Sequence, residues 1–270
     1  MGTLYLVATP IGNLEDISLR AMRVLKDVSL IAAEDTRRTR KLLSHYDIHT
    51  PLTSYHEHNK RAKLGFLLKR LAEGDVAVVS EAGTPGMSDP GYELVVACVE
   101  RGVAMVAVPG ASVLPAAVVV SGLPTSRFLF LGFLPRREGE RKRLLTEVAT
   151  LPYTLVALEA PHRLRRTLVL IREVLGERRL ALCRELTKFH EEVFRGTPST
   201  ALGRFTEPLG EFTLVIEGVA LERVDVAAVE VELGRLKAQG LTARDALAEM
   251  SGLSGLSRRE LYRLWLTLKA

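Results

Sequence analysis

A loop rich in glycine, proline and carboxylate side chains spans residues 80–91. It reads Ser-Glu-Ala-Gly-Thr-Pro-Gly-Met-Ser-Asp-Pro-Gly and follows the apolar run 76–79. Glycine lets the backbone adopt positive φ and approach a ligand closely, and proline fixes φ and stiffens the loop. Ordinary connections between a strand and a helix have about two to six residues, and this loop is longer. We therefore predict that it binds a small molecule and does not merely join two elements.

Three other segments also follow apolar runs and carry residues suited to ligand contact. In a parallel sheet the carboxyl ends of the strands lie on one edge, so all four segments are expected to meet in one crevice. The glycine pattern typical of dinucleotide-binding proteins is absent, so an NAD site is unsupported. The three segments are 9–16, which begins Thr-Pro-Ile-Gly-Asn, 34–37, which is Glu-Asp-Thr-Arg, and 109–112, which is Pro-Gly-Ala-Ser.

Carboxylates in or near these loops are the candidates for a base or for stabilising developing charge. Asp35 and Glu81 rank first as catalytic residues, because each follows a central strand of the predicted sheet. The alternative role for Asp35 is to cap the helix that follows it. The remaining candidates are Glu15, Asp16, Glu34, Asp89, Glu159, His162, Glu185 and Lys188.

The elements that must position these residues alternate between strand and helix in the first half of the chain. Such alternation predicts a largely parallel sheet with helices on both faces. The second half has shorter, hairpin-like connections, so a mixed sheet is expected there. Strands are predicted at 4–8, 30–33, near 52, 76–79 and 105–108, then at 128–131, 153–158, 180–183, 191–195 and 212–216. Helices are predicted at 17–28, 36–46, 60–73, 92–101, 140–150 and 162–175.

We expect the chain to divide into an α/β domain at 1–133, a second α/β domain at 134–222 and a helical tail at 223–270. The tail has no strand pattern, and a helix is expected at 226–239. Two shorter helices should begin at residues 242 and 257, where the spacing is typical of a capping box. This arrangement resembles a helix-turn-helix unit. The alternative is a small bundle that packs on the second domain.

Composition sets broad limits on the class of protein. The chain has 270 residues, 47% of them hydrophobic and 26% charged, as in ordinary soluble globular proteins. Its net charge of +5 suits a polyanionic partner but is a weak signal. Cys98 and Cys183 are expected to be buried free thiols, which is typical of a cytoplasmic protein. The six histidines lack metal-ligand spacing, and prolines and glycines interrupt the uncharged stretch 102–126, so neither a metal site nor a membrane span is expected.

Six motifs resemble, in the same order, those of the ribosomal small-subunit methyltransferase I group of the tetrapyrrole methylase superfamily. The resemblance extends from Leu4 to Gly218. Two positions differ from the usual pattern of the group, which has Asp in place of Glu81 and Pro in place of Ala111. The motifs are residues 8–16, 33–37, 83–85, 109–110, 160–163 (Ala-Pro-His-Arg) and 184–188 (Arg-Glu-Leu-Thr-Lys).

The resemblance implies two α/β domains of the tetrapyrrole methylase type with a cofactor cleft between them, and a small helical C-terminal tail. It implies S-adenosylmethionine (SAM) as methyl donor and the 2′-oxygen of a cytidine in 16S ribosomal RNA as acceptor. It also implies a homodimer, and the ribosomal substrate implies a cytoplasmic location. The expected cofactor contacts are Pro10, Gly83, Thr84, Met87, Ser112, Leu158, Leu186 and Thr213.

Basic residues cluster after the proposed crevice loops. Such clustering favours a nucleic acid over a small carboxylated ring, and the shortage of interleaved aromatics indicates phosphate contact more than base readout. A methylase of a tetrapyrrole or other small acceptor, and a non-catalytic RNA-binding assembly factor, remain as alternatives. The expected substrate contacts are Arg37, Arg38, Lys41, His162, Arg163 and Lys188.

The helix at 92–101 and the helix expected after the strand at 105–108 are relevant to the expected homodimer. Their segments 94–99 and 113–120 carry no charge. A helix that is apolar on all sides must be covered all round. The sheet covers one side, and either a partner subunit or the second domain of the same chain covers the other.

Overall fold

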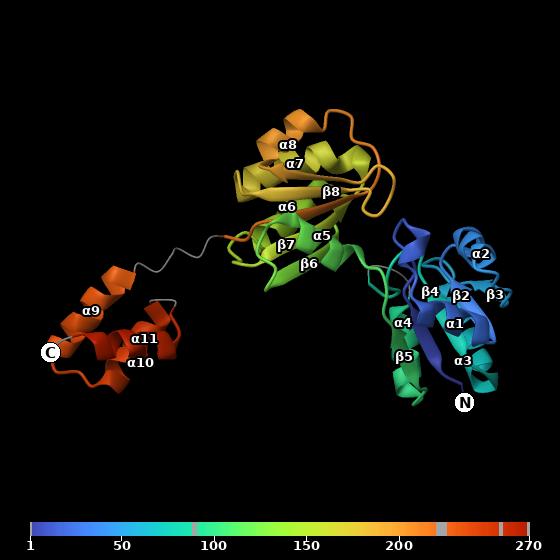
Figure 1. Cartoon of the computed structure of the whole chain (residues 1–270), viewed down its shortest axis with the longest axis horizontal. Helices are drawn as coiled ribbons and strands as arrows, with labels where there is room; N and C mark the ends of the chain where they lie inside the picture. The colour runs from blue at the N-terminus through green and yellow to red at the C-terminus, as the bar shows by residue number, and fades with distance from the viewer. Residues whose placement is uncertain (1, 88–90, 220–225, 254–255, 269–270) are drawn as a thin grey trace. The chain divides into compact units, whose positions relative to one another are not determined.

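The computed structural model describes residues 2–87, 91–219, 226–253 and 256–268. The chain forms two compact units, Met1–Gly218 and Val219–Ala270 (Figure 1). The first unit contains two five-stranded sheets, and the second contains helices only among its described residues. The α/β class predicted from the sequence is therefore confirmed.

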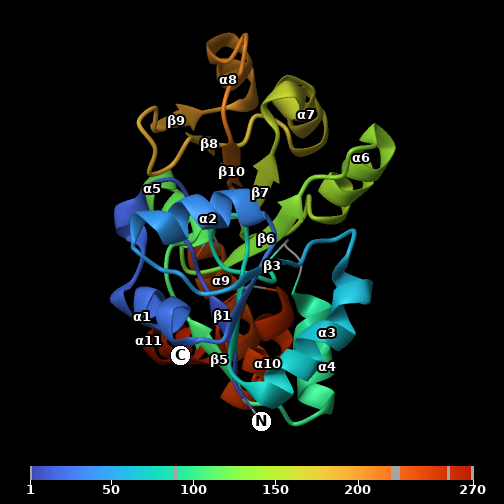
Figure 2. The same cartoon turned by 90° about the vertical axis from the view of Figure 1, so that its right-hand side faces the viewer.

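The first sheet is parallel throughout, with strand order β3-β2-β4-β1-β5. Successive side chains of a strand point to opposite faces, and β4 illustrates this. Ala77 and Val79 pack with α1 and α2, whereas Val76 and Val78 pack with α3 and α4. Figure 2 shows these two pairs of helices on opposite sides of the strands. The elements are β1 (Leu4–Val7), α1 (Leu19–Asp27), β2 (Leu30–Ala33), α2 (Thr36–His45), β3 (Leu52–Ser54), α3 (Lys60–Glu73), β4 (Val76–Val79), α4 (Tyr92–Glu100) and β5 (Met105–Val108).

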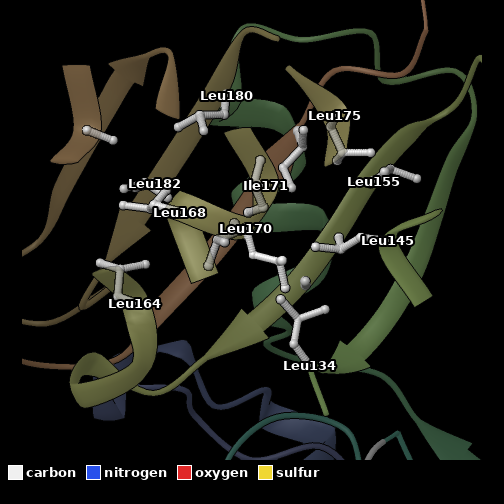
Figure 3. Packing of buried hydrophobic residues seen from close by; sticks show 14 of the residues in the cluster. Leu134, Leu145, Leu155, Leu164, Leu168, Leu170, Ile171, Leu175, Leu180 and Leu182 are labelled. Atoms are coloured by element: carbon white, nitrogen blue, oxygen red, sulfur yellow. The ribbon is translucent and has the colours of Figure 1, made fainter. Parts of the chain in front are cut away.

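The second sheet is mixed, as predicted, with strand order β6-β7-β10-β8-β9. Only the β6–β7 pair is parallel among the described pairs. Figure 3 shows leucines of α7 meeting those of β7 and β8 in the core on one face. The elements are β6 (Phe128–Phe133), α6 (Glu138–Glu147), β7 (Thr154–Glu159), α7 (Pro161–Leu175), β8 (Leu180–Arg184), β9 (Glu192–Gly196), α8 (Pro198–Arg204) and β10 (Phe212–Ile216).

The helix α5 (Val113–Ser121) follows the first sheet in the chain but packs on the second. Its Leu114, Ala117 and Val118 belong to the same buried cluster as Val156 and Val215. The second half of the same chain therefore covers one side of this uncharged helix. The adjoining strand β6 also belongs to the second sheet, so the predicted boundary at 133 falls after the first strand of that sheet.

The second unit is a bundle of α9 (Val226–Ala238), α10 (Ala243–Leu253) and α11 (Arg258–Thr267). Leu233, Leu261 and Trp265 belong to its own buried core. Both predicted helix starts are present. Ser257 and Glu260 form a capping box, and Thr242 accepts a hydrogen bond from the Asp245 amide. The predicted boundary at 222–223 lies outside the described residues.

Two predictions from composition concern the thiols and a membrane span. Cys98 and Cys183 are both buried and unbridged, which confirms the first prediction. As for the second, none of the helices in the described part of the chain has the length and apolar character needed to span a membrane.

Candidate functional site

A cavity of about 740 Å³ lies between the two sheets and is lined by residues from both. This volume is within the range of roughly 300–1,000 Å³ found for small-molecule sites. The first sheet contributes the loops at the carboxyl ends of its strands, as expected for a parallel sheet. The predicted site residues that line it are Pro10, Arg38, Lys41, Glu81, Gly83, Thr84, Met87, Ser112, Leu158, Leu186, Lys188 and Thr213.

The loops after β1 and β4 are joined by a short backbone bridge. The Thr9 amide donates to the Gly83 carbonyl at 2.9 Å, and the Gly83 amide donates to the Thr9 carbonyl at 3.0 Å. Gly83 has φ +80°, a conformation that glycine adopts without strain. A Cβ atom there would also lie 3.4 Å from Cγ2 of Ile11. Glycine at this position therefore keeps the two loops paired along the cavity wall.

The hydroxyl of Thr9 is buried beside this bridge. Among the described residues it has no hydrogen-bond partner, although Thr9 lines the cavity. A buried hydroxyl without a partner costs free energy, so such groups usually find one in a ligand or a water molecule. This hydroxyl is therefore a candidate contact for a polar ligand.

Two carboxylates line the cavity on the side of the first sheet. Glu34 accepts a hydrogen bond from the Glu81 amide at 3.1 Å, and Glu81 forms an ion pair with Arg38. The Glu81 side chain remains 40% exposed, so a substrate can reach it. This position agrees with a catalytic role for Glu81 but does not test it.

Asp35 does not line the cavity but caps α2. Its Oδ1 accepts hydrogen bonds from the amides of Arg37 at 2.8 Å and Arg38 at 3.2 Å. Both bonds lower the pKa of Asp35, and the bond from the Arg38 amide has the larger effect on it. The structure thus shows the capping role that the sequence left open, and the catalytic role of Asp35 stays a prediction.

The second sheet supplies a largely apolar wall. Leu158 of β7 pairs in register with Thr213 of β10, and both line the cavity. Phe130 and Phe133 of β6 line the cavity as well, and sequence reasoning missed them because β6 was assigned to the first domain. Cys183 also lines it, and burial raises the pKa of this thiol to about 12, so it is neutral at physiological pH.

The carboxylate of Glu159 is fully buried at the end of β7 and lines the cavity. It accepts hydrogen bonds from the Ala160 amide at 2.8 Å and the Thr167 hydroxyl at 2.6 Å, and it pairs with Arg163. Arg163 and His162 themselves do not line the cavity, and His162 is exposed. Their predicted role as substrate contacts remains untested.

A strained turn follows β8 at the rim of the cavity. Glu185 and Thr187 adopt positive φ values of 50° and 66°, which residues other than glycine seldom do. Glu185 Oε1 accepts hydrogen bonds from the Glu211 amide at 2.8 Å and from Lys188 Nζ at 3.1 Å. Lys188 Nζ also donates to a Glu211 carboxylate oxygen at 2.8 Å. These contacts hold the turn in its strained form.

The same turn connects the two sheets across the cavity. The Asn13 amide, in the loop after β1, donates to the Thr187 hydroxyl at 3.1 Å. Gly12 lies so close that a Cβ atom there would be 2.7 Å from the same hydroxyl oxygen. The cavity is therefore closed on this side by direct contact between the two halves.

Glu185, Lys188 and Glu211 form a charged cluster at the turn. Burial raises the pKa of the Glu185 carboxyl, but the Glu211 amide and the Lys188 ammonium outweigh burial and leave this pKa below its usual value. Burial lowers the pKa of Lys188, but Glu211 and Glu185 together raise it above its usual value. Both groups are therefore charged near neutral pH.

The described part of the chain contains no cluster of side chains suited to binding a metal ion. No group of three or more His, Cys, Asp or Glu side chains there could hold a metal ion.

Solved structures share the fold of this chain. Uroporphyrin-III-C-methyltransferase from Thermus thermophilus is 23% identical, with a TM-score of 0.57 over 80% of this chain and 94% of that protein. A diphthine synthase is 12% identical, with a TM-score of 0.66 over 80% of this chain and 90% of that protein. The fold of the chain is thus shared with these two proteins.

Sequence comparisons show the family to which the chain belongs. The family model for Tetrapyrrole (Corrin/Porphyrin) Methylases matches residues 3–201. A relative from Synechocystis is 50% identical over 100% of this chain and 99% of that protein, and one from Halalkalibacterium halodurans is 45% identical over 98% and 94%. Both are named ribosomal RNA small subunit methyltransferase I. The chain belongs to the tetrapyrrole methylase family, in the group of the ribosomal RNA small subunit methyltransferases I, as its motifs predicted.

Proposed function

We propose that this protein transfers a methyl group from SAM to the 2′-oxygen of a cytidine ribose in 16S ribosomal RNA. The name of the close relatives supports ribosomal RNA as the substrate. The motif resemblance supports the ribose oxygen and the cytidine. The observation that carries the proposal is the cavity of about 740 Å³ lined by both sheets, with the basic helix α2 at its rim.

The residues of the cavity fit the chemical groups of SAM. The backbone at Gly83 and Thr84 and the hydroxyls of Thr9 and Ser112 offer hydrogen bonds to its amino-acid and ribose groups. The apolar wall around Leu158 suits the adenine ring. When bound, SAM supplies an electrophilic methyl group on a positively charged sulfonium. The protein then needs mainly to orient the acceptor, which can lower a barrier by roughly 7–11 kcal/mol.

Glu81 is the better candidate for the group that accepts the proton of the ribose hydroxyl. A hydroxyl is a weak nucleophile, and a positioned base helps it react. Glu81 lines the cavity and is partly exposed, and Arg38 restrains its carboxylate. Asp35, in contrast, is held by two backbone amides that lower its pKa and make it a weaker base.

The exposed face of α2 is suited to the RNA backbone. Arg37, Arg40 and Lys41 surround a second, shallow hollow with Ser44 and His45. Within the described ranges, no carboxylate forms an ion pair with these three cations at 4 Å or less. Unpaired cations at the rim of the cavity are available to bind phosphates.

We also infer a homodimer that works in the cytoplasm, where ribosomes are assembled. Val99 of α4 and Val119 of α5 are 63% and 69% exposed. A second copy of the chain covering these side chains is consistent with the dimeric state that the family resemblance implies.

Transfer of labelled methyl from SAM tests the proposed function. Small ribosomal subunits from a strain that lacks this modification should take up label, and precorrin should not. Label on precorrin alone would favour the small-acceptor alternative. Binding of RNA without binding of SAM would favour a non-catalytic assembly factor.

A further inference from the structure

The last helix of the tail, α11, has an exposed basic face. Four of its residues follow Arg258 by one, four, five and eight positions, and this spacing places all five on one side of a helix. Leu261 and Trp265 lie on the opposite side, in the core of the tail. The exposed face consists of Arg258, Arg259, Tyr262, Arg263 and Leu266.

The three arginines of this face are not engaged within the tail. Two other cations of the tail are engaged: Arg235 pairs with Glu232, and Lys237 donates to the carbonyls of Trp265 and Leu268. In the described ranges of the chain, no carboxylate lies within ion-pair distance of Arg258, Arg259 or Arg263. The three charges are therefore free to meet an anionic partner.

The one carboxylate within α11, that of Glu260, caps the start of the helix. Glu260 accepts hydrogen bonds from the Ser257 amide at 2.8 Å and the Ser257 hydroxyl at 2.6 Å. It thereby completes the capping box that starts the helix. The helix is fixed by this cap at one end and by its apolar side in the core, so the arginines are presented on a rigid element.

Among the described residues, the tail contributes none to the lining of the cavity. The first unit, Met1–Gly218, contains every residue that lines it. The tail is therefore suited to an auxiliary role rather than to the chemistry.

We propose that the exposed face of α11 binds the phosphate backbone of a folded segment of the RNA substrate. This proposal rests on the proposed function. Arginine forks match phosphate geometry, and the deep, narrow major groove of an RNA helix prevents side chains from reading the bases there. Binding should accordingly depend on salt and little on sequence. Tyr262 adds a ring that can stack on an unpaired base.

The test is a full-length variant with Arg258→Ala, Arg259→Ala and Arg263→Ala. Its dissociation constant for small subunits should rise about 10-fold, and the slope of log affinity against log salt should fall by roughly two to three, or about 0.9 for each lost phosphate contact. The KM for subunits should rise with it, while kcat and SAM affinity stay unchanged. The triple Arg→Lys variant should retain the wild-type salt slope.

The matched control removes three cations that are already paired, by Arg70→Ala, Arg179→Ala and Arg235→Ala. These side chains pair with Glu73, Glu217 and Glu232. If the α11 variant and this control bind subunits alike, the proposal is wrong. A change in sedimentation mass without a change in RNA binding would contradict it too and would indicate a contact between copies. If wild-type protein does not methylate subunits at all, the proposed function fails instead.

Discussion

At the scale of single residues, the backbone conformation and the neighbouring Ile11 both limit which residue type can occupy position 83. We predict that Gly83→Val weakens SAM binding at least 10-fold, because a branched side chain at φ +80° adds roughly 1–3 kcal/mol of strain and crowds Ile11. Calorimetry on the folded variant measures this effect.

The matched control is Gly102→Val. Gly102 has φ +62°, a Cβ atom there would meet nothing within 4 Å, and the residue does not line the cavity. The Gly102→Val substitution introduces similar strain away from the cavity and should leave the affinity for SAM unchanged. If the wild-type protein and the Gly83→Val variant bind SAM with equal affinity, this loop is not part of the cofactor site.

Lys188 stabilises the strained turn at the cavity rim, and its contribution depends on pH. We predict that Lys188→Met lowers the free energy of unfolding by roughly 2 kcal/mol at pH 7, because the half-buried Glu185 loses a charged hydrogen-bond donor. The pKa of Glu185 is lowered in the folded protein. The contribution is therefore fully present above the usual pKa of a glutamate and is lost as pH falls through the lowered value.

Urea denaturation of the wild-type protein and of the Lys188→Met variant between pH 7 and pH 3 measures how this contribution depends on pH. The difference in stability should shrink as the pH approaches 3. A difference that stays constant over the whole range would show that Lys188 acts through packing of its methylene chain alone.

At the scale of secondary-structure elements, α2 contributes residues to the cavity lining and also carries exposed cations of its own. We predict that replacing Arg37, Arg38 and Lys41 by Ala weakens RNA binding about 10-fold and flattens its salt dependence. SAM affinity should remain intact, because these side chains offer phosphate contacts and the expected cofactor contacts lie elsewhere. Filter binding at several salt concentrations measures the effect.

The control for α2 lies on α1, where Arg20, Arg23 and Lys26 are also exposed. None of them lines the cavity. Replacing these three by Ala removes the same charge and should change RNA binding much less. Equal losses from both variants would mean that only net charge matters.

Elements with strong local signals could be predicted from the sequence alone. Helix α3 begins and ends at the predicted residues 60 and 73, because its apolar spacing is helical and Asn59 and Gly74 flank it. The strands of the first sheet are short apolar runs between turn residues, so their places were predictable as well. Local sequence determines such elements.

Pairing between distant elements could not be predicted in the same way. Phe128–Phe133 is an apolar strand that fits either sheet, and only tertiary contacts assign it to β7. The lining residues Phe130 and Phe133 were missed for that reason. Arg163 belongs to a family motif, yet it pairs with Glu159 at the end of β7 and does not line the cavity.

At the scale of the whole molecule, the exposed apolar side chains on α4 and α5 lead to a prediction of oligomeric state. We expect a homodimer at micromolar concentration, with a mass twice the 29.7 kDa of one chain. An obligate interface of this kind buries about 2,000 Å² or more. Sedimentation equilibrium measures the mass directly, and a single species of one chain's mass would exclude the dimer.

The central claim is that the cavity between the two sheets carries out methyl transfer to a ribose oxygen of the small-subunit RNA. The most direct test is mass spectrometry of nucleosides from unmodified small subunits after reaction with the wild-type protein and isotope-labelled SAM. The account predicts labelled 2′-O-methylcytidine at a single position of 16S ribosomal RNA. Label on a nucleobase, or no label in the RNA while SAM binds, would contradict it.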